Sequence, residues 1–265
     1  MLWIKHEKGR CDGFEEVGGG DWATAVGLAA AAGLLTIVKP VERSFSLTDM
    51  RLSYGYKEKE TIPEWLCLFL ALFIPLGVQI VWLLPRRKLN ALHLSVLGLS
   101  LSLTLTLFLA SVAKVLFGRL RPDWLARCNA DYNGKYPIDI PGKLATISIC
   151  NPSRRREQVE GMKSFFSGHA AVSFAGLAFL ALFLSHQLQL LQRPKAYKIP
   201  AVLLPLLLAI FIAATRLSDF RHHWEDVAVG SGIGCLTAII AHRIYLPLIE
   251  SDSTSSDANI LDECA

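Results

Sequence analysis

The densest cluster of ionisable side chains lies between two apolar segments, in the stretch TRLSDFRHHWED (215–226). His222 and Asp226 are four residues apart, so on a helix the carboxylate can reach the imidazole and fix its tautomer. Arg216 lies in the turn before His222, and His223 is the weaker candidate because its neighbour has the carboxylate at the favourable spacing. The alternative is a polar hairpin, but ionisable groups at membrane depth are expensive and normally functional.

A second group of basic residues ends an earlier apolar segment, in KVLFGRLRPDW (114–124). Lys114 and Arg121 are seven residues apart, nearly two helical turns, so both can lie on one face of a helix that Pro122 stops. Two cations on one face can bind an anion. The alternative is that both side chains only extend from the membrane interior toward the lipid headgroups.

Ser167, Gly168 and His169 open another apolar segment. The first turn of a helix offers unpaired backbone N–H groups and the positive end of the helix dipole, which favour anions. Ser167 can cap this helix, Gly168 lets an anion approach the backbone closely, and His169 lies in the first turn. The alternative is an ordinary helix cap followed by an interfacial histidine.

Together, the three clusters describe an anion site with two proton-handling groups. Three cations match the charge of a phosphate group, and an arginine can hold two phosphate oxygens at once. Two histidines on opposite sides of that phosphate can supply a nucleophile and a general acid. No carboxylate cluster and no His or Cys spacing in the sequence suggests a metal ion.

The elements that must position these clusters are long apolar segments. The 265-residue chain is 52% hydrophobic, and its apolar residues gather in runs long enough to cross a bilayer as helices. The stretch 98–111 alternates like a strand but belongs to an uncharged run too long for one strand, so we expect helix there. A soluble helical protein is disfavoured because too little polar sequence remains to cover six such segments. The expected spans are 22–38, 64–84, 91–113, 167–185, 199–215 and 227–246.

Six spans put both ends of the chain on one side of the membrane and the three clusters on the other. Residues 1–20 form a polar tail without the apolar core of a signal peptide, so the six-span domain, 21–246, is expected to begin with an uncleaved anchor. The acidic segment 247–265 is expected to be disordered. Basic residues in the short connections 85–90 and 186–198 favour cytoplasmic ends, but the other side has more basic residues in total, so charge alone leaves the orientation open.

Cys128 and Cys150 share the long connection between the third and fourth spans. They can form a disulfide if that connection faces an oxidising compartment, and two free thiols are the equal alternative. Cys67 and Cys235 lie within spans and are expected to be packing residues. The net charge of +4, with no basic run interleaved with aromatic residues, gives no indication of nucleic-acid binding.

The motifs K-x6-R-P (114–122), S-G-H (167–169) and R-x5-H-x3-D (216–226) resemble, in order and spacing, the three signature motifs of the type 2 phosphatidic acid phosphatases, or lipid phosphate phosphatases. The resemblance implies an all-α fold, a six-helix transmembrane bundle of the superfamily that includes the vanadium-dependent haloperoxidases. Phe166 stands where the family usually has proline, although an aromatic residue occurs there in some eukaryotic members. Thr215 stands where the family usually has serine, and the hydroxyl is retained.

The resemblance also implies roles for the motif residues. His222 is expected to be the nucleophile that forms a phospho-histidine, with Asp226 orienting it. His169 is expected to protonate the leaving alcohol and then to activate water. No metal or other cofactor is implied, since fixed positive charge would stabilise the transferring phosphoryl group. The residues expected to bind the substrate phosphate are Lys114, Arg121, Ser167, Gly168 and Arg216.

The implied activity is that of an integral-membrane, Mg²⁺-independent phosphatase whose phospholipid substrate lies in the bilayer: phosphatidate, lysophosphatidate or diacylglycerol pyrophosphate. The stretch RLSDFRHHWEDV (216–227) most resembles the eukaryotic diacylglycerol pyrophosphate phosphatase type. The resemblance places the site on the lumenal or extracytoplasmic face of an endomembrane, vacuolar or plasma membrane, with cytoplasmic ends, and is compatible with a homo-oligomer. One alternative is a related phosphatase acting on sphingoid base phosphates, polyprenyl diphosphates or sugar phosphates. The other is a non-enzymatic phospholipid-binding membrane protein, which the presence of both histidines and Asp226 disfavours.

Overall fold

The computed structural model describes residues 19–130, 144–151 and 155–262. Within these ranges the chain is helical and contains no named strand, as the all-α expectation requires. Six helices are long and apolar enough to cross a membrane, and they confirm the six expected spans. They are α1 (Gly19–Ile37), α2 (Glu64–Leu83), α3 (Leu89–Phe117), α6 (Gly168–Gln187), α7 (Ile199–Ser218) and α8 (Trp224–Asp262).

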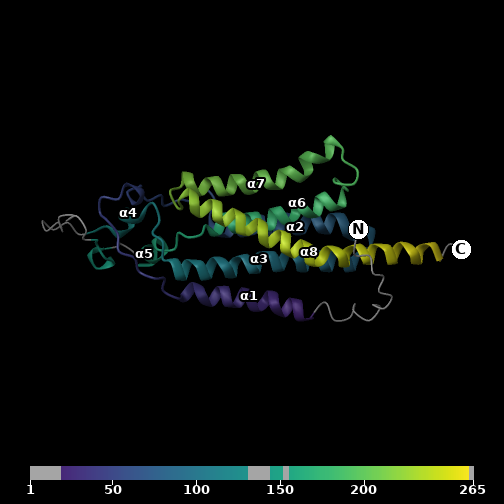
Figure 1. Cartoon of the computed structure of the whole chain (residues 1–265), viewed down its shortest axis with the longest axis horizontal. Coiled ribbons are helices and arrows are strands. Elements are labelled where there is room, and N and C mark those ends of the chain that lie inside the picture. The colour runs from purple at the N-terminus through teal and green to yellow at the C-terminus, as the bar shows by residue number, and fades with distance from the viewer. Residues whose placement is uncertain (1–18, 131–143, 152–154, 263–265) are drawn as a thin grey trace, which may run out of the picture.

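The six helices run along the long axis of the molecule (Figure 1). The start of α1 and the end of α8 lie at one end of this bundle. The short helices α4 (Trp124–Cys128) and α5 (Arg155–Gly161) lie at the other end. The three motif clusters are at the α4–α5 end as well, because α3 and α7 finish there and α6 and α8 start there. We call it the site end.

Helix α6 is the centre of the bundle and packs against α2, α3, α7 and α8. Small residues allow this close packing. A Cβ atom added at Gly176 would lie 2.0 Å from the carbonyl oxygen of Ala71 in α2, and one added at Gly234 of α8 would lie 2.2 Å from the carbonyl oxygen of Ala171. The first turn of α6 is thereby placed in the middle of the site end.

Helix α3 contains the Ser- and Thr-rich stretch 98–111, which is helical as expected. The hydroxyl groups of Thr104 and Thr106 each donate to a carbonyl oxygen one turn earlier, at 2.8 Å. This pattern removes an unpaired polar group from the apolar interior. The Thr106 hydroxyl also lies 2.6 Å from that of Thr237, which links α3 to α8.

The expectation that Lys114 and Arg121 share one helical face is wrong. Helix α3 ends at Phe117, before Pro122, because Gly118 adopts the left-handed conformation with φ 52°. Only glycine fits there, since a Cβ atom would lie 1.8 Å from the carbonyl oxygen of Val41. Arg121 therefore lies on the loop that follows the helix.

A small cap covers the site end. Its core consists of Phe45, Leu52, Leu120, Trp124, Cys128 and Met162, and so combines the α1–α2 connection with the α3–α6 connection. Cys128 and Cys150 are joined by a disulfide, which decides between the two alternatives left open by the sequence. Cys67 and Cys235 are free, and Cys67 is buried.

Helix α8 continues to Asp262, whereas the sequence predicts a disordered tail from residue 247. The apolar span ends at Ile249, but the change to polar residues does not by itself interrupt the backbone hydrogen bonds of a helix. The division of the chain at residues 20 and 246 stays a prediction, and residues 1–18 lie outside the described part of the chain.

Candidate active site

A cavity of about 910 Å³ opens at the site end. Both motif histidines, His169 and His222, line it, together with Arg121 and Arg216. We call it the charged cavity, because charged side chains from the α1–α2 connection and from α5 complete its wall. These further residues include Glu58, Lys59, Glu60, Arg156, Glu157 and Glu160.

His222 lies in the turn before α8 and is buried. Its Nδ1 atom lies 2.8 Å from the backbone carbonyl oxygen of Ser164. A carbonyl oxygen can only accept, so Nδ1 carries the proton and the lone pair is on Nε2. Burial, followed by the positive charges of Arg121 and Lys114 and by His169, holds the pKa of His222 well below its ordinary value of 6.5. The imidazole is thus neutral at physiological pH, with one nitrogen free to attack.

Asp226 does not form the expected hydrogen bond with His222. The distance from Oδ2 to His222 Nδ1 is 4.0 Å, because α8 begins only at Trp224 and the two residues do not share a helical turn. Asp226 instead accepts from the Ser164 hydroxyl at 2.6 Å and from Arg119 Nη1 at 2.7 Å. It therefore holds the segment whose carbonyl orients His222.

His223 makes the contacts with Asp226 that the sequence spacing had suggested for His222. Its backbone N–H donates to Asp226 Oδ2 at 3.1 Å, and its Nδ1 lies 3.3 Å from the same oxygen. His223 is not among the residues that line the charged cavity, and it lines a smaller pocket together with His222. These contacts anchor Asp226 at the start of α8.

His169 lies in the first turn of α6, as the sequence indicates. Its Nε2 atom is 3.1 Å from the backbone carbonyl oxygen of Ile62 and 3.3 Å from Arg216 Nη1. The shorter contact, to an obligatory acceptor, places a proton on Nε2. A carboxylate oxygen of Glu60 lies 3.9 Å from this nitrogen. His169 thus offers a proton at the edge of the charged cavity.

Arg216 is buried, and its charge is balanced by two carboxylates. Nη2 lies 3.1 Å from Asp219, and Nη1 lies 2.7 Å from Glu60. The hydroxyl of Thr215 accepts from Nε and from Nη2, so the hydroxyl retained at that position holds the guanidinium. The paired charges allow an arginine to be buried here.

Asp219 connects this arginine to the α1–α2 connection. It accepts from Lys57 Nζ at 2.5 Å and from the backbone N–H and hydroxyl of Thr61, at 2.7 and 2.8 Å. Burial by itself raises the pKa of Asp219, but these bonds and the charge of Arg216 outweigh it and hold the pKa below its ordinary value of 3.8. The carboxylate fixes the segment that carries Glu60.

Arg121 lines the cavity from the loop after α3. Burial lowers its pKa from the ordinary value, and the neighbouring Arg127 adds to this effect. Its Nη2 atom lies 3.7 Å from Glu160 of α5. Burial raises the pKa of Glu160, but the charges of Arg121 and Lys114 outweigh this and lower it. The guanidinium group of Arg121 keeps its charge, and an anion in the cavity can replace Glu160 as its partner.

Lys114 reaches the first turn of α6. A Cβ atom added at Gly168 would lie 3.2 Å from Lys114 Nζ, so the glycine makes room for this ammonium group. Ser167 caps α6 as expected, since its hydroxyl accepts from the backbone N–H of Ala170 at 3.4 Å. The positive end of α6 and a cation therefore meet beside His169.

A second cavity, of about 400 Å³, adjoins the first and is mainly apolar. Leu68, Leu107 and Val172 contribute to its wall, and Lys114 and His169 lie at its charged end. We call it the apolar pocket. Glu64 and His169 line both cavities, so the two meet at the general-acid candidate.

The structure brings all eight predicted site residues to one end of the bundle, and it adds partners that the sequence did not reveal. Glu60 carries no spacing signal, because its partners Arg216 and Arg221 are far away along the chain. Asp219 and Arg221 are different, since both lie inside the charged stretch 215–226 and could have been noted there. Among the described residues no group of His, Cys, Asp or Glu could hold a metal ion, and metal independence stays a prediction.

Known proteins are similar to most of this chain. The family model described as the PAP2 superfamily matches residues 95–250. Lipid phosphate phosphatase 1 of Arabidopsis thaliana is 35% identical over 231 residues, which cover 86% of this chain and 68% of that protein. Diacylglycerol pyrophosphate phosphatase 1 of Saccharomyces cerevisiae is 34% identical over 218 residues, covering 80% of this chain and 74% of that protein. No solved structure shows a significant match.

Proposed function

The chain belongs to the PAP2 superfamily, and from this premise we propose that it is a lipid phosphate phosphatase that works through a phospho-histidine without a metal ion. One observation carries the proposal. A charged cavity and an apolar pocket meet at His169. A phosphate ester of a lipid needs both, because its phosphate requires cations and its acyl chains require an apolar surface.

In the first step, the substrate phosphate lies between the two histidines. Nε2 of His222 forms a bond to phosphorus while the ester P–O bond breaks, and His169 gives its proton to the leaving alcohol oxygen. The negative charge of the transferring group is stabilised by fixed cations and by the first turn of α6, so no reorganisation is needed during the step. The groups that contribute are Lys114, Arg121, Arg216, Ser167 and the backbone of Gly168.

In the second step, His169 takes a proton from water, and the resulting oxygen attacks the phospho-histidine. The P–N bond breaks, inorganic phosphate forms, and the lone pair returns to His222 Nε2. The Ser164 carbonyl keeps the ring in the reactive tautomer throughout, because it continues to accept from Nδ1. Asp226 contributes by holding Ser164 and Arg119.

The proposal that the substrate is a lipid can be tested by measuring the contributions of the charged cavity and the apolar pocket separately. Purified protein in detergent with excess EDTA should release phosphate from phosphatidate much faster than from glycerol 3-phosphate, which has the same ester linkage without acyl chains. Ser111→Trp narrows the apolar pocket. It should slow phosphatidate hydrolysis by about tenfold and leave the slow hydrolysis of glycerol 3-phosphate unchanged. Equal rates on the two substrates, or loss of activity in EDTA, would contradict the proposal.

We further propose that the site end faces a non-cytoplasmic compartment. The Cys128–Cys150 disulfide lies in the cap, and structural disulfides persist in oxidising compartments. The short connections at the opposite end carry Arg86 and Lys198, in agreement with cytoplasmic positive charge. A glycosylation site inserted near residue 148 should be modified in cells, and one inserted near residue 193 should not. The reverse pattern would reverse the orientation.

A further inference from the structure

Arg221 lines the charged cavity beside His222 and has no role in the mechanism above. Its side chain is buried, with the residue 5% exposed. Nη2 donates to the carbonyl oxygen of Lys57 at 2.7 Å, and the guanidinium lies 5.0 Å from the centre of the Tyr56 ring. Its Nε atom is buried and has no hydrogen-bond partner within the part of the chain that the structure describes. A buried donor of this kind is unfavourable unless an acceptor reaches it.

The neighbouring Arg127 shows what a purely structural arginine looks like in the same wall. Its Nε and Nη2 donate to the two carboxylate oxygens of Asp123, at 2.9 and 2.8 Å. This bidentate pairing commits its charge to the protein. Arg221 lies 3.9 Å from the same carboxylate, beyond hydrogen-bond distance. The charge of Arg221 is therefore not committed to Asp123.

Glu60 marks where such a ligand would bind. Its Oε2 atom lies 2.7 Å from Arg216 Nη1, and its Oε1 atom lies 3.3 Å from Arg221 Nη2. The carboxylate bridges the two guanidinium groups with one oxygen on each. A phosphoryl group can make the same bridge, because its oxygens also project in several directions from one centre.

The position of this bridge relative to His169 identifies it as the side from which the leaving group departs. Glu60 Oε2 is 3.9 Å from His169 Nε2, the atom that carries the proton. Arg216 Nη1 is 3.3 Å from the same nitrogen. A group bound between Arg216 and Arg221 is thus next to the proton donor, while the phosphoryl group under attack is next to His222.

We propose that Arg221 and Arg216 form a second anion subsite that binds the non-transferred phosphoryl group of a lipid diphosphate, and that the Glu60 carboxylate fills this subsite in the free protein. The inference rests on the proposed function and assigns a substrate class to one part of its site. Glu60 can give way because its side chain is 24% exposed, whereas both arginines are buried. With a phosphate monoester, Arg216 contacts the transferred phosphoryl group and Glu60 remains beside Arg221, whereas a diphosphate displaces Glu60 from both arginines.

The chemistry of a diphosphate requires such a subsite. Nε2 of His222 bonds to the terminal phosphorus, the bond from that phosphorus to the bridging oxygen breaks, and the electron pair leaves on that oxygen. The leaving group is a lipid phosphate monoester, whose second pKa is about 6, so it can depart as an anion with little need for the proton of His169. The new negative charge develops beside Arg221 and Arg216, where two guanidinium groups stabilise it.

The test compares two substrates in one preparation of the full chain in detergent. Arg221→Gln should lower kcat/KM for diacylglycerol pyrophosphate by tenfold or more and that for phosphatidate by less than threefold. Arg221→Lys should restore part of the difference because it keeps a cation. Arg156→Gln is the matched control, since Arg156 lines the same cavity but is exposed, and both substrates should change by less than twofold.

Inhibition by inorganic anions gives a second measure that does not depend on turnover of the diphosphate. Pyrophosphate should inhibit phosphatidate hydrolysis at a concentration at least tenfold lower than phosphate does, and Arg221→Gln should remove that difference. Glu60→Gln should strengthen pyrophosphate inhibition severalfold, because the internal competitor has lost its charge.

The outcomes distinguish this inference from the function on which it rests. If the wild type hydrolyses neither lipid, the proposed function fails. If it hydrolyses both and Arg221→Gln slows them equally, Arg221 serves the transferred phosphate and the second subsite is wrong. Equal inhibition of the wild type by phosphate and pyrophosphate would also overturn the subsite.

Discussion

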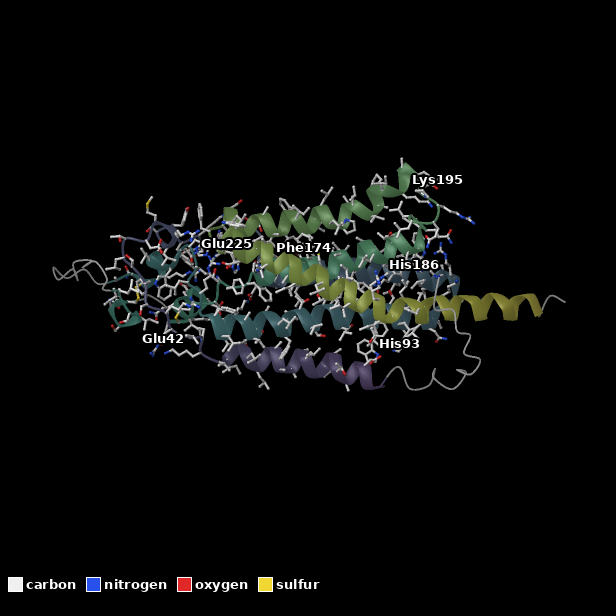
Figure 2. The ribbon with its side chains drawn as sticks, in the orientation of Figure 1. Glu42, His93, Phe174, His186, Lys195 and Glu225 are labelled. Atoms are coloured by element: carbon white, nitrogen blue, oxygen red, sulfur yellow. A yellow bond between two sulfur atoms is a disulfide. The ribbon has the colours of Figure 1, made fainter. Side chains whose placement is uncertain are left out.

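The two ends of the helix bundle (Figure 2) differ in how far their charged side chains are buried. At the end that holds His186 and Lys195, basic side chains lie on the surface and bind backbone carbonyls. Lys198, for example, donates to the carbonyl oxygens of Leu188 and Arg193 at 2.6 and 3.0 Å. Cations at helix C-termini are stabilised there by the helix dipole and by water. These residues need no carboxylate partner.

At the site end, the charged groups of the site are buried and depend on one another. Arg216, Asp219, Asp226 and Asp123 are almost completely inaccessible, and each has an opposite charge within hydrogen-bond distance. Burial without a partner would be prohibitive. The comparison teaches that a basic residue at a membrane border indicates a site only where it is buried with its counter-ions.

The largest expected difference between the two ends concerns their histidines. His222→Ala should lower phosphatidate turnover by about three orders of magnitude or more, because the proposed nucleophile is lost. His186→Ala, at the opposite end, should change it by less than twofold. Phosphate release from phosphatidate in detergent measures both. Residual activity of His222→Ala within tenfold of the wild type would remove this residue as the nucleophile.

A smaller effect is expected for the carboxylate that holds the Ser164 segment. Asp226→Asn should lower kcat by about 10- to 100-fold, since the Arg119 ion pair is lost and the Ser164 carbonyl is less well placed for His222. Glu225→Gln is the neighbouring control and should cost less than twofold, because Glu225 is partly exposed. Equal effects of the two substitutions on kcat would contradict the positioning role of Asp226.

Stability should follow the same division between buried and exposed charges. Asp219→Ala removes the ion pair of Lys57 and one of the two carboxylates that balance the buried Arg216, and it should lower the free energy of unfolding by about 2–4 kcal/mol. Glu42→Gln removes an exposed ion pair with Lys39 and should cost less than about 0.5 kcal/mol. Thermal unfolding in detergent should rank the two. A larger shift for Glu42→Gln would break the comparison.

The smallest expected effect is a displacement of the pH profile. Protonation of His222 abolishes its lone pair, so kcat/KM should fall on the acid side only below the lowered pKa, well under 6.5. Arg121→Gln removes one of the positive charges that lower this pKa, so it should move the acid limb toward 6.5. Arg86→Gln, at the opposite end, should leave the limb in place. An acid limb of the wild type at 6.5 or above would contradict the environment described for His222.

The sequence was sufficient to predict the six spans and to place the eight motif residues at one end of the bundle, for identifiable reasons. A span is a local property of about 20 apolar residues, so it can be recognised without knowledge of its neighbours. The motifs lie at the ends of those spans. Because successive spans cross the membrane in opposite directions, the span ends that carry the motifs lie on the same side. The cap of α6 by Ser167 is local as well, and it was predicted correctly.

The tertiary structure decided what surrounds those residues. The carbonyl oxygen of Val41, far away in sequence, lies where a Cβ atom at position 118 would be, so only glycine fits there. The tautomer of His222 depended on the Ser164 carbonyl, and not on the carboxylate four residues along the chain. Glu60 entered the site from the α1–α2 connection without any spacing signal. Local sequence determines helices and their ends, whereas the partners of a buried charge depend on which distant segments the packing brings together.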